Sequence, residues 1–276
     1  MVLKALSIAA TGMNAQQVNL EVIANNIANV NTTGFKRASA EFSDLMYAPD
    51  RLSAVPTAGT TEAVPEGSYV GFGVQTSAVR RIFGQGSFQE TKHQFDMMIA
   101  GRGYFQVQKP TGEIFYTRDG TFTPNADGQL VTQHGEMLIP TITLNQQDIL
   151  KVTINDTGAV YVSTKADPSP QAPAFQIQLA SFTNEAGLEP MGDNLFRETS
   201  SSGNPTIGDP NSLGFGSIKQ GYLEASNVDS VREITQLIAA QRAYEMNSKV
   251  VQAADEMSGI VSVSYTHLTL PTKRIV

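Results

Sequence analysis

The residues that could hold a metal ion are few and widely spaced. The histidines His93, His134 and His267 have no second histidine four residues away, and the chain contains no cysteine. A structural zinc site needs four closely placed nitrogen or sulfur ligands, so we expect no metal. The sequence HGE from His134 is half of a deaminase signature without the cysteine pair that completes it, which favours a hairpin turn.

Carboxylates in the middle of the chain leave one enzymatic alternative open. Glu113, Asp119, Asp127 and Glu136 lie in a turn-rich region, and a glycosidase needs only two acids. A β-rich carbohydrate-active or carbohydrate-binding protein is therefore an alternative. No serine elbow, P-loop or metal-binding helix accompanies these acids, and the glycine pairs in GRGYF and GFGVQT lack the third glycine of a dinucleotide site. We expect no catalytic residue and no cofactor.

Composition narrows the classes of partner. The 276 residues are 41% hydrophobic, which is enough for one large or two modest domains. The net charge of −7 gives no basic surface for nucleic acid. No apolar run reaches the roughly 18 residues of a membrane-spanning helix, and the apolar start is too short for a secretory signal.

The first 34 residues predict a helix. Leu6, Met13, Leu20 and Ile27 recur every seven residues, and Ile23 and Val30 follow at the matching offset. We expect Gly34 to stop the helix in a left-handed cap, with Phe35 packing back on Val30. Asn25, Asn26 and Asn29 then fall inside the helix, where asparagine costs up to about 0.7 kcal/mol relative to alanine.

The other end of the chain predicts a partner helix over residues 223–262. One stripe carries Ile234, Leu237, Tyr244 and Val251, with Ile238 beside it and Gln241 as a polar break. Closing the long intervening loop costs little more than closing a short one. The two helices therefore predict a two-helix coiled-coil stem built from both termini.

The residues between the helices predict an inserted β domain. Residues 35–73 contain several prolines and glycines and are expected to form an extended connector. Alternating runs and Asp-Gly turns over residues 74–222 predict mostly antiparallel strands. The fold class is α+β. Residues 263–276 depart from the helical pattern and are expected to be a non-native tail.

Both ends of the chain resemble one known family. TGMNAQQVNLEVIANNIANVNTTGFKR and QGYLEASNVDSVREITQLIAAQRAYEMNSKVVQAADEM resemble the terminal signatures of bacterial flagellar rod and hook proteins. MMIAGRGYFQVQ, YTRDGTF and ADGQLVTQHGEML are similar to the β domain of that family. Chain length and the short connector favour the distal rod group. A proximal rod or hook subunit is the alternative within the family.

The resemblance implies a structural role and not an enzymatic one. It implies a subunit that polymerises into a rigid tubular drive shaft, transmits torque and surrounds the export channel. The implied partners are other copies, other rod and hook proteins, the surrounding bushing rings and the flagellar type III export apparatus, without nucleic acid or membrane insertion. The implied location is the periplasm-spanning rod of the basal body, reached without a cleaved signal peptide. The asparagines would then fix the register of packed helices.

Overall fold

The computed structural model describes residues 2–51, 68–143, 149–164 and 172–268. The chain divides into two compact units. The helical unit comprises Met1–Asn25, Ala38–Arg80 and Val231–Val276, and the β unit comprises Asn26–Arg37 and Arg81–Ser230. No helix in the described residues has the length and apolar character needed to span a membrane.

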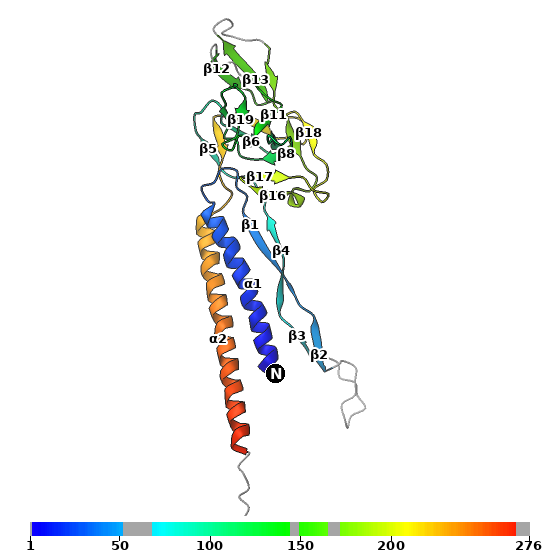
Figure 1. The fold of residues 1–276 in the computed structure, drawn as a ribbon, viewed down its shortest axis with the longest axis vertical. Coiled ribbons are helices and arrows are strands. Elements are labelled where there is room, and N and C mark those ends of the chain that lie inside the picture. The colour runs from blue at the N-terminus through cyan, green and yellow to red at the C-terminus, as the bar shows by residue number, and fades with distance from the viewer. Residues whose placement is uncertain (1, 52–67, 144–148, 165–171, 269–276) are drawn as a thin grey trace, which may run out of the picture. The chain divides into compact units, whose positions relative to one another are not determined.

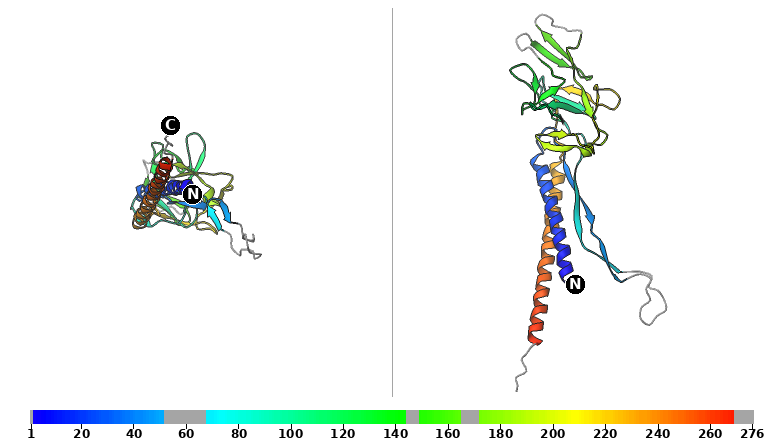
Figure 2. Two further views of the ribbon diagram at one scale, coloured as in Figure 1. Left: turned by 90° about the horizontal axis from the view of Figure 1, so that it is seen from below. Right: turned by 45° about the vertical axis from the view of Figure 1, so that its right-hand side comes forward.

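The helical unit is built on two long helices, α1 (Val2–Ala28) and α2 (Ser230–Leu268). They run side by side in opposite directions (Figures 1 and 2). They approach closely at Gly12, where an added Cβ would lie 2.8 Å from Nδ2 of Asn247. On α2, the buried Ala240 and Ala254 lie two heptads apart on one face.

The helical unit also contains a ribbon of strands, here called the arm (residues 38–51 and 68–80). Strand β1 (Ala38–Asp44) pairs with β4 (Val74–Arg81), and β2 (Tyr47–Arg51) pairs antiparallel with β3 (Ser68–Gly71). In the described part of the region expected to be an extended connector, most residues thus form paired strands. Pro49 is tolerated within β2 because a two-stranded ribbon leaves one backbone edge of each strand unpaired.

The β unit is organised around an antiparallel sheet. In the described residues this sheet has nine strands, ordered β16-β17-β8-β7-β11-β10-β9, with β15 joining β7 to β18. Their bounds are β7 (Tyr104–Gln108), β8 (Ile114–Thr117), β9 (Thr123–Pro124), β10 (Leu130–Val131), β11 (Met137–Ile139), β15 (Leu179–Ser181), β16 (Glu189–Gly192), β17 (Leu195–Arg197) and β18 (Thr206–Gly208). In the register, Phe105 lies opposite both Thr117 and Leu179.

Smaller antiparallel sheets complete the β unit. One holds β12 (Ile149–Ile154), β13 (Ala159–Thr164) and β14 (Phe175–Gln176). Strand β6 (Met97–Ala100) pairs with β19 (Ser217–Gln220), and β5 (Phe88–Glu90) pairs with β20 (Tyr222–Glu224). A short 3-10 helix covers Glu185–Gly187. Two helices and a mostly antiparallel β region confirm the predicted α+β class.

The core of the β unit lies among these sheets. Its buried residues come from strands distant in sequence, and the rings of Phe105 and Phe122 meet edge to face at 5.4 Å. A second cluster comprises Tyr104, Tyr116, Ala180, Phe182, Leu188 and Phe196. The apolar residues that alternate along these strands in the sequence therefore pack into the core of the β unit.

The helix boundaries differ from those predicted. Helix α1 ends at Ala28, so Gly34 is not its cap and Phe35 is not the cap's apolar contact. The last turn tightens, because the N–H groups of Asn29 and Val30 donate to carbonyls three residues back, at 3.2 and 3.3 Å. Gly34 does adopt a left-handed φ of 68°, in the later turn.

Helix α2 also differs from its predicted range. It begins at Ser230 and not at residue 223, because residues 222–224 pair with β5 as strand β20. The helix continues to Leu268, past the predicted end at residue 262. The predicted non-native tail lies partly outside the described residues, since residues 269–276 are not described.

Candidate functional site

The predicted stem residues of α1 differ in how far their side chains are exposed to solvent. Ile23 and Asn26 are buried, and Asn25 is exposed. The remaining residues of the predicted set are half-buried: Leu6, Met13, Leu20, Ile27, Asn29 and Val30. Asn29 and Val30 lie just beyond the helix end at Ala28. Asn29 therefore does not incur the free-energy penalty of an asparagine inside a helix. Its Oδ1 accepts a hydrogen bond from Thr32 Oγ1 at 3.2 Å.

On α2 the large apolar residues that carried the prediction are mostly exposed. Leu237 and Val251 are half-buried, while the other predicted residues are exposed: Ile234, Ile238, Gln241 and Tyr244. The buried face instead carries Glu233 and the small residues Ala240 and Ala254. The sequence signal for this face was two alanines fourteen residues apart, which a search for large apolar residues misses.

A further apolar surface on α2 faces solvent within the single chain. Its side chains are 45–70% exposed, and they are Ile234, Ile238, Met246, Val250, Met257 and Ile260. A helix that packs on one face only normally keeps the opposite face polar. An apolar surface of this kind marks an interaction site.

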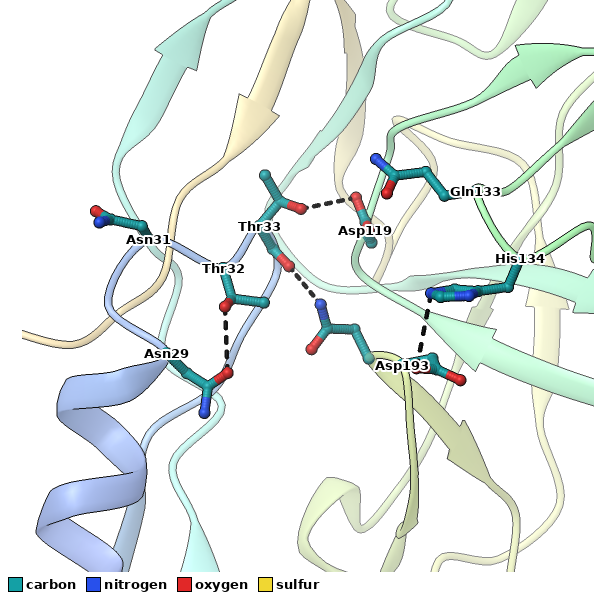
Figure 3. A pocket seen from close by; sticks show the side chains of 9 residues that line it. Asn29, Asn31, Thr32, Thr33, Asp119, Gln133, His134 and Asp193 are labelled. Carbon is teal, nitrogen blue, oxygen red and sulfur yellow. Dashed lines mark hydrogen bonds and ion pairs between the residues drawn. The ribbon is translucent and has the colours of Figure 1, made fainter.

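The turn after α1 borders a polar pocket in the β unit (Figure 3). Asn29, Asn31, Thr32 and Thr33 form one side, and Asp119, Gln133, His134, Asp193 and Asn194 form the other. Thr33 Oγ1 donates to Asp119 Oδ1 at 3.1 Å, and Asn194 Nδ2 donates to the Thr33 carbonyl at 2.8 Å. His134 Nε2 lies 3.6 Å from Asp193 Oδ1, and both side chains are exposed.

Asp119 is the ionisable group most affected by this environment. Burial raises the pKa of its carboxyl, hydrogen bonds from Thr121 and Thr33 oppose the rise, and the nearby Asp96 carboxylate adds to it. Asp119 thus serves mainly as an acceptor that joins the turn after α1 to the segment that follows strand β8.

A buried charge cluster joins segments of the β unit that are far apart in the sequence. Lys36 and Glu224 are each 1% exposed, and Lys36 Nζ lies 2.6 Å from Glu224 Oε1. Glu224 Oε1 also accepts the Gly86 N–H at 2.9 Å, and Arg118 Nη1 lies 3.5 Å from Glu224 Oε2. Burial lowers the pKa of Lys36, and the Glu224 carboxylate opposes that shift. Sequence reasoning missed this cluster, because Lys36 and Glu224 are 188 residues apart.

Asn227 joins three backbone segments beside this cluster, and no local sequence pattern pointed to this role. Its Oδ1 accepts the Arg37 N–H at 2.7 Å. Its Nδ2 donates to the carbonyls of Ile82 at 2.7 Å and Gly84 at 2.9 Å. The Ile82 N–H in turn donates to the Arg37 carbonyl at 2.9 Å. One amide therefore fixes the strands by which the chain enters and leaves the β unit.

The central carboxylates do not gather in one groove. Glu113 lines a hollow with Glu198, whereas Asp119 lines the polar pocket. Asp127 lies in an exposed turn, and Glu136 is hydrogen-bonded to Thr132. In the described residues, no three acidic or histidine side chains are grouped closely enough to hold a metal ion.

Three family models match the chain, one to each part of this architecture. The flagella basal body rod protein model matches residues 6–36, the flagellar hook protein FlgE/F/G D1 domain matches residues 98–162, and the flagellar basal body rod FlgEFG protein C-terminal model matches residues 219–262. The flagellar basal-body rod protein FlgG of Agrobacterium fabrum is 53% identical over 94% of this chain and 98% of its own length.

The chain belongs to the flagellar basal-body rod family.

Two proteins of Caulobacter vibrioides place it within that family. FlgG of that organism is 50% identical over 92% of this chain and 97% of its own length. FlgF is 36% identical over 87% of this chain and 88% of its own length. The distal rod group, FlgG, is therefore the family branch that this chain matches, as the sequence predicted. The chain is a structural rod protein, and the carbohydrate alternative is set aside.

Proposed function

We propose that the chain polymerises with copies of itself into the distal part of the flagellar rod. In this proposal α1 and α2 form a coiled-coil stem that packs into an inner tube around the export channel, and the β unit forms an outer layer. The tube acts as a rigid drive shaft that transmits torque. Family membership supports the structural role, and the antiparallel contact at Gly12 supports the stem.

The observation that carries the proposal is the exposed apolar surface of α2. Ala240 and Ala254 are buried, whereas Ile234 and Ile238 remain about half exposed. Burying a large aliphatic side chain stabilises an interface by about 1.5–3 kcal/mol. A subunit surrounded by copies in a closed tube would cover this second surface.

The proposal also includes the specific binding partners and the location of the rod. We propose contacts with other rod and hook proteins at the rod ends, and with the bushing rings around a rod that spans the periplasm. Subunits would leave through the flagellar type III export apparatus and keep α1, because α1 builds the tube wall. The proposed domain plan has four parts, which are residues 1–34, 35–73, 74–222 and 223–262. The proposal of a non-native tail from residue 263 is supported by the family model match, which ends at residue 262.

The test is complementation of a flagellated bacterium that lacks its own FlgG. Ile238→Glu places a charge on the exposed apolar surface, and Gln236→Glu places the same charge on an exposed polar position of α2. We expect Ile238→Glu to abolish swimming and the distal rod seen by electron microscopy of basal bodies, and Gln236→Glu to retain both. Circular dichroism should show both purified variants as helical as the parent. Normal rods from Ile238→Glu would refute the proposed interface.

A further inference from the structure

The arm rests on α1 at Gly73. The backbone φ of Gly73 is 117°, a conformation that side chains with a Cβ rarely adopt. A Cβ built at this position would overlap Oγ1 of Thr11 and lie 3.5 Å from Cα of Ile8. Glycine therefore allows the arm backbone to touch the helix surface directly.

Thr11 supplies the polar part of this contact. Its hydroxyl donates to the Ile8 carbonyl at 2.8 Å, which orients the oxygen, and accepts the Val74 N–H at 3.4 Å. One side of α1 carries Thr11 and Lys4, and Lys4 Nζ lies 5.9 Å from the centre of the Phe72 ring. Three successive arm residues thus meet one stripe of the helix.

The arm is irregular at the same place. Leu45 N–H donates to the Gly73 carbonyl at 2.9 Å, and the Ser77 hydroxyl donates to the Ser43 hydroxyl at 2.9 Å. The regular strands break between these two contacts, since Leu45 and Met46 separate β1 from β2, and Phe72 and Gly73 separate β3 from β4. The break coincides with the place where the arm meets α1.

We propose that Gly73 and Thr11 are positioning residues that dock the arm on α1 of the same chain, so that helix and arm act as one body in the assembled rod. The docking is a property of the single chain. Only its role in the polymer rests on the proposed function. The two claims can therefore fail separately.

The docking can be measured as a distance, because the chain has no cysteine of its own. Ala24→Cys in α1 and Met46→Cys in the arm are exposed sites for a pair of spin labels. Pulsed electron paramagnetic resonance on the full chain should give one narrow distance. Gly73→Ala should lose that narrow distance and give a shifted or broadened distribution.

The matched control is Gly71→Ala. Gly71 lies in the same ribbon, and an added Cβ would touch only the Tyr47 ring, at 3.3 Å, which can move aside. This variant should keep the parent distance. Thr11→Val removes the acceptor at similar volume and should broaden the distance, and Thr11→Ser restores the hydroxyl and should recover it. Equal helical content by circular dichroism shows that α1 itself is intact.

The outcomes separate the two claims. If Gly73→Ala and Thr11→Val both keep the parent distance, the docking is refuted. If both broaden it but still build straight rods with full swimming, the positioning role is refuted. If both broaden it and swimming falls while Gly71→Ala and Thr11→Ser swim normally, the proposal is supported. Failure of the parent chain to complement would instead refute the proposed function and leave the docking unaffected.

Discussion

Replacing Glu224 by glutamine should be the most damaging single change of charge in the β unit. The carboxylate is 1% exposed and lies between the Lys36 ammonium at 2.6 Å and the Arg118 guanidinium at 3.5 Å. Glutamine keeps the volume and an oxygen that can accept the Gly86 N–H. It removes the carboxylate that pairs with both of these buried cations.

The magnitude follows from leaving charges buried without compensation. Breaking a buried ion pair by removing one partner costs about 3–5 kcal/mol, against a typical total stability of about 5–15 kcal/mol for a domain. The matched control is Glu189→Gln. Glu189 pairs with Arg197 at 2.6 Å, but the two side chains are 47% and 46% exposed. An exposed pair contributes about 0–1 kcal/mol.

Urea unfolding followed by the near-ultraviolet circular dichroism of tyrosine tests this difference. Arg118 lies 5.1 Å from the centre of the buried Tyr104 ring, so that signal reports on the cluster. Lys36→Met added to Glu224→Gln should recover part of the loss, because it removes one uncompensated cation. If Glu224→Gln unfolds at the same urea concentration as Glu189→Gln, the reasoning is refuted.

Three further predictions concern backbone strain, the asparagines and pH. Gly34→Ala should destabilise the chain by at least about 1–2 kcal/mol in urea unfolding, because its φ is 68° and the added Cβ would lie 2.8 Å from the backbone N of Asp119. Asn26→Ala should destabilise the purified chain by about 1–3 kcal/mol, because Asn26 is buried, whereas Asn25→Ala should leave thermal unfolding unchanged and lower rod assembly. Asp119→Asn should raise the melting temperature at neutral pH, since burial raises the pKa of Asp119 in the folded chain and its ionisation therefore opposes folding.

Each of these has its own control. Gly112 has a φ of 91° and no atom within 4 Å of an added Cβ, so Gly112→Ala should cost only the backbone strain and less than Gly34→Ala. Normal rods from Asn25→Ala would remove the register role of that residue. The advantage of Asp119→Asn should shrink as the pH falls through the raised pKa of Asp119, because the native carboxyl becomes protonated. An advantage that is independent of pH would contradict the assignment.

Local patterns predicted the elements that depend on neighbouring residues. Both terminal helices, the antiparallel middle and the hairpin turn at His134-Gly135 follow from periodicity and turn chemistry, and the Gly135 N–H donates to the Thr132 carbonyl at 3.0 Å. The same reasoning treated two Asp-Gly pairs alike. Gly128 has a φ of 77° and closes a turn to Asn125. Gly120 instead lies so close to the Met97 carbonyl that a Cβ would overlap it.

Long-range contacts could not be predicted from one sequence. No local sequence pattern indicated that Lys36 pairs with Glu224. Gly34 has the left-handed backbone that we expected, but it does not cap α1. Its N–H instead donates to the Glu224 carbonyl at 2.8 Å. The face of α2 was misread for a related reason. A helix that approaches another closely buries alanine, while its large residues remain for other contacts.

The side chain of Asn227 has a mechanical consequence. The chain passes between the helical unit and the β unit at four places, after Asn25, Arg37, Arg80 and Ser230. A single polypeptide tether swivels freely about its φ and ψ angles and cannot carry a twisting load. Asn227 joins the backbone next to three of the four crossings through hydrogen bonds of 2.7–2.9 Å. Within the β unit, the segments next to these crossings are therefore held side by side, so that they cannot turn independently of one another at the points where the chain leaves for the helical unit.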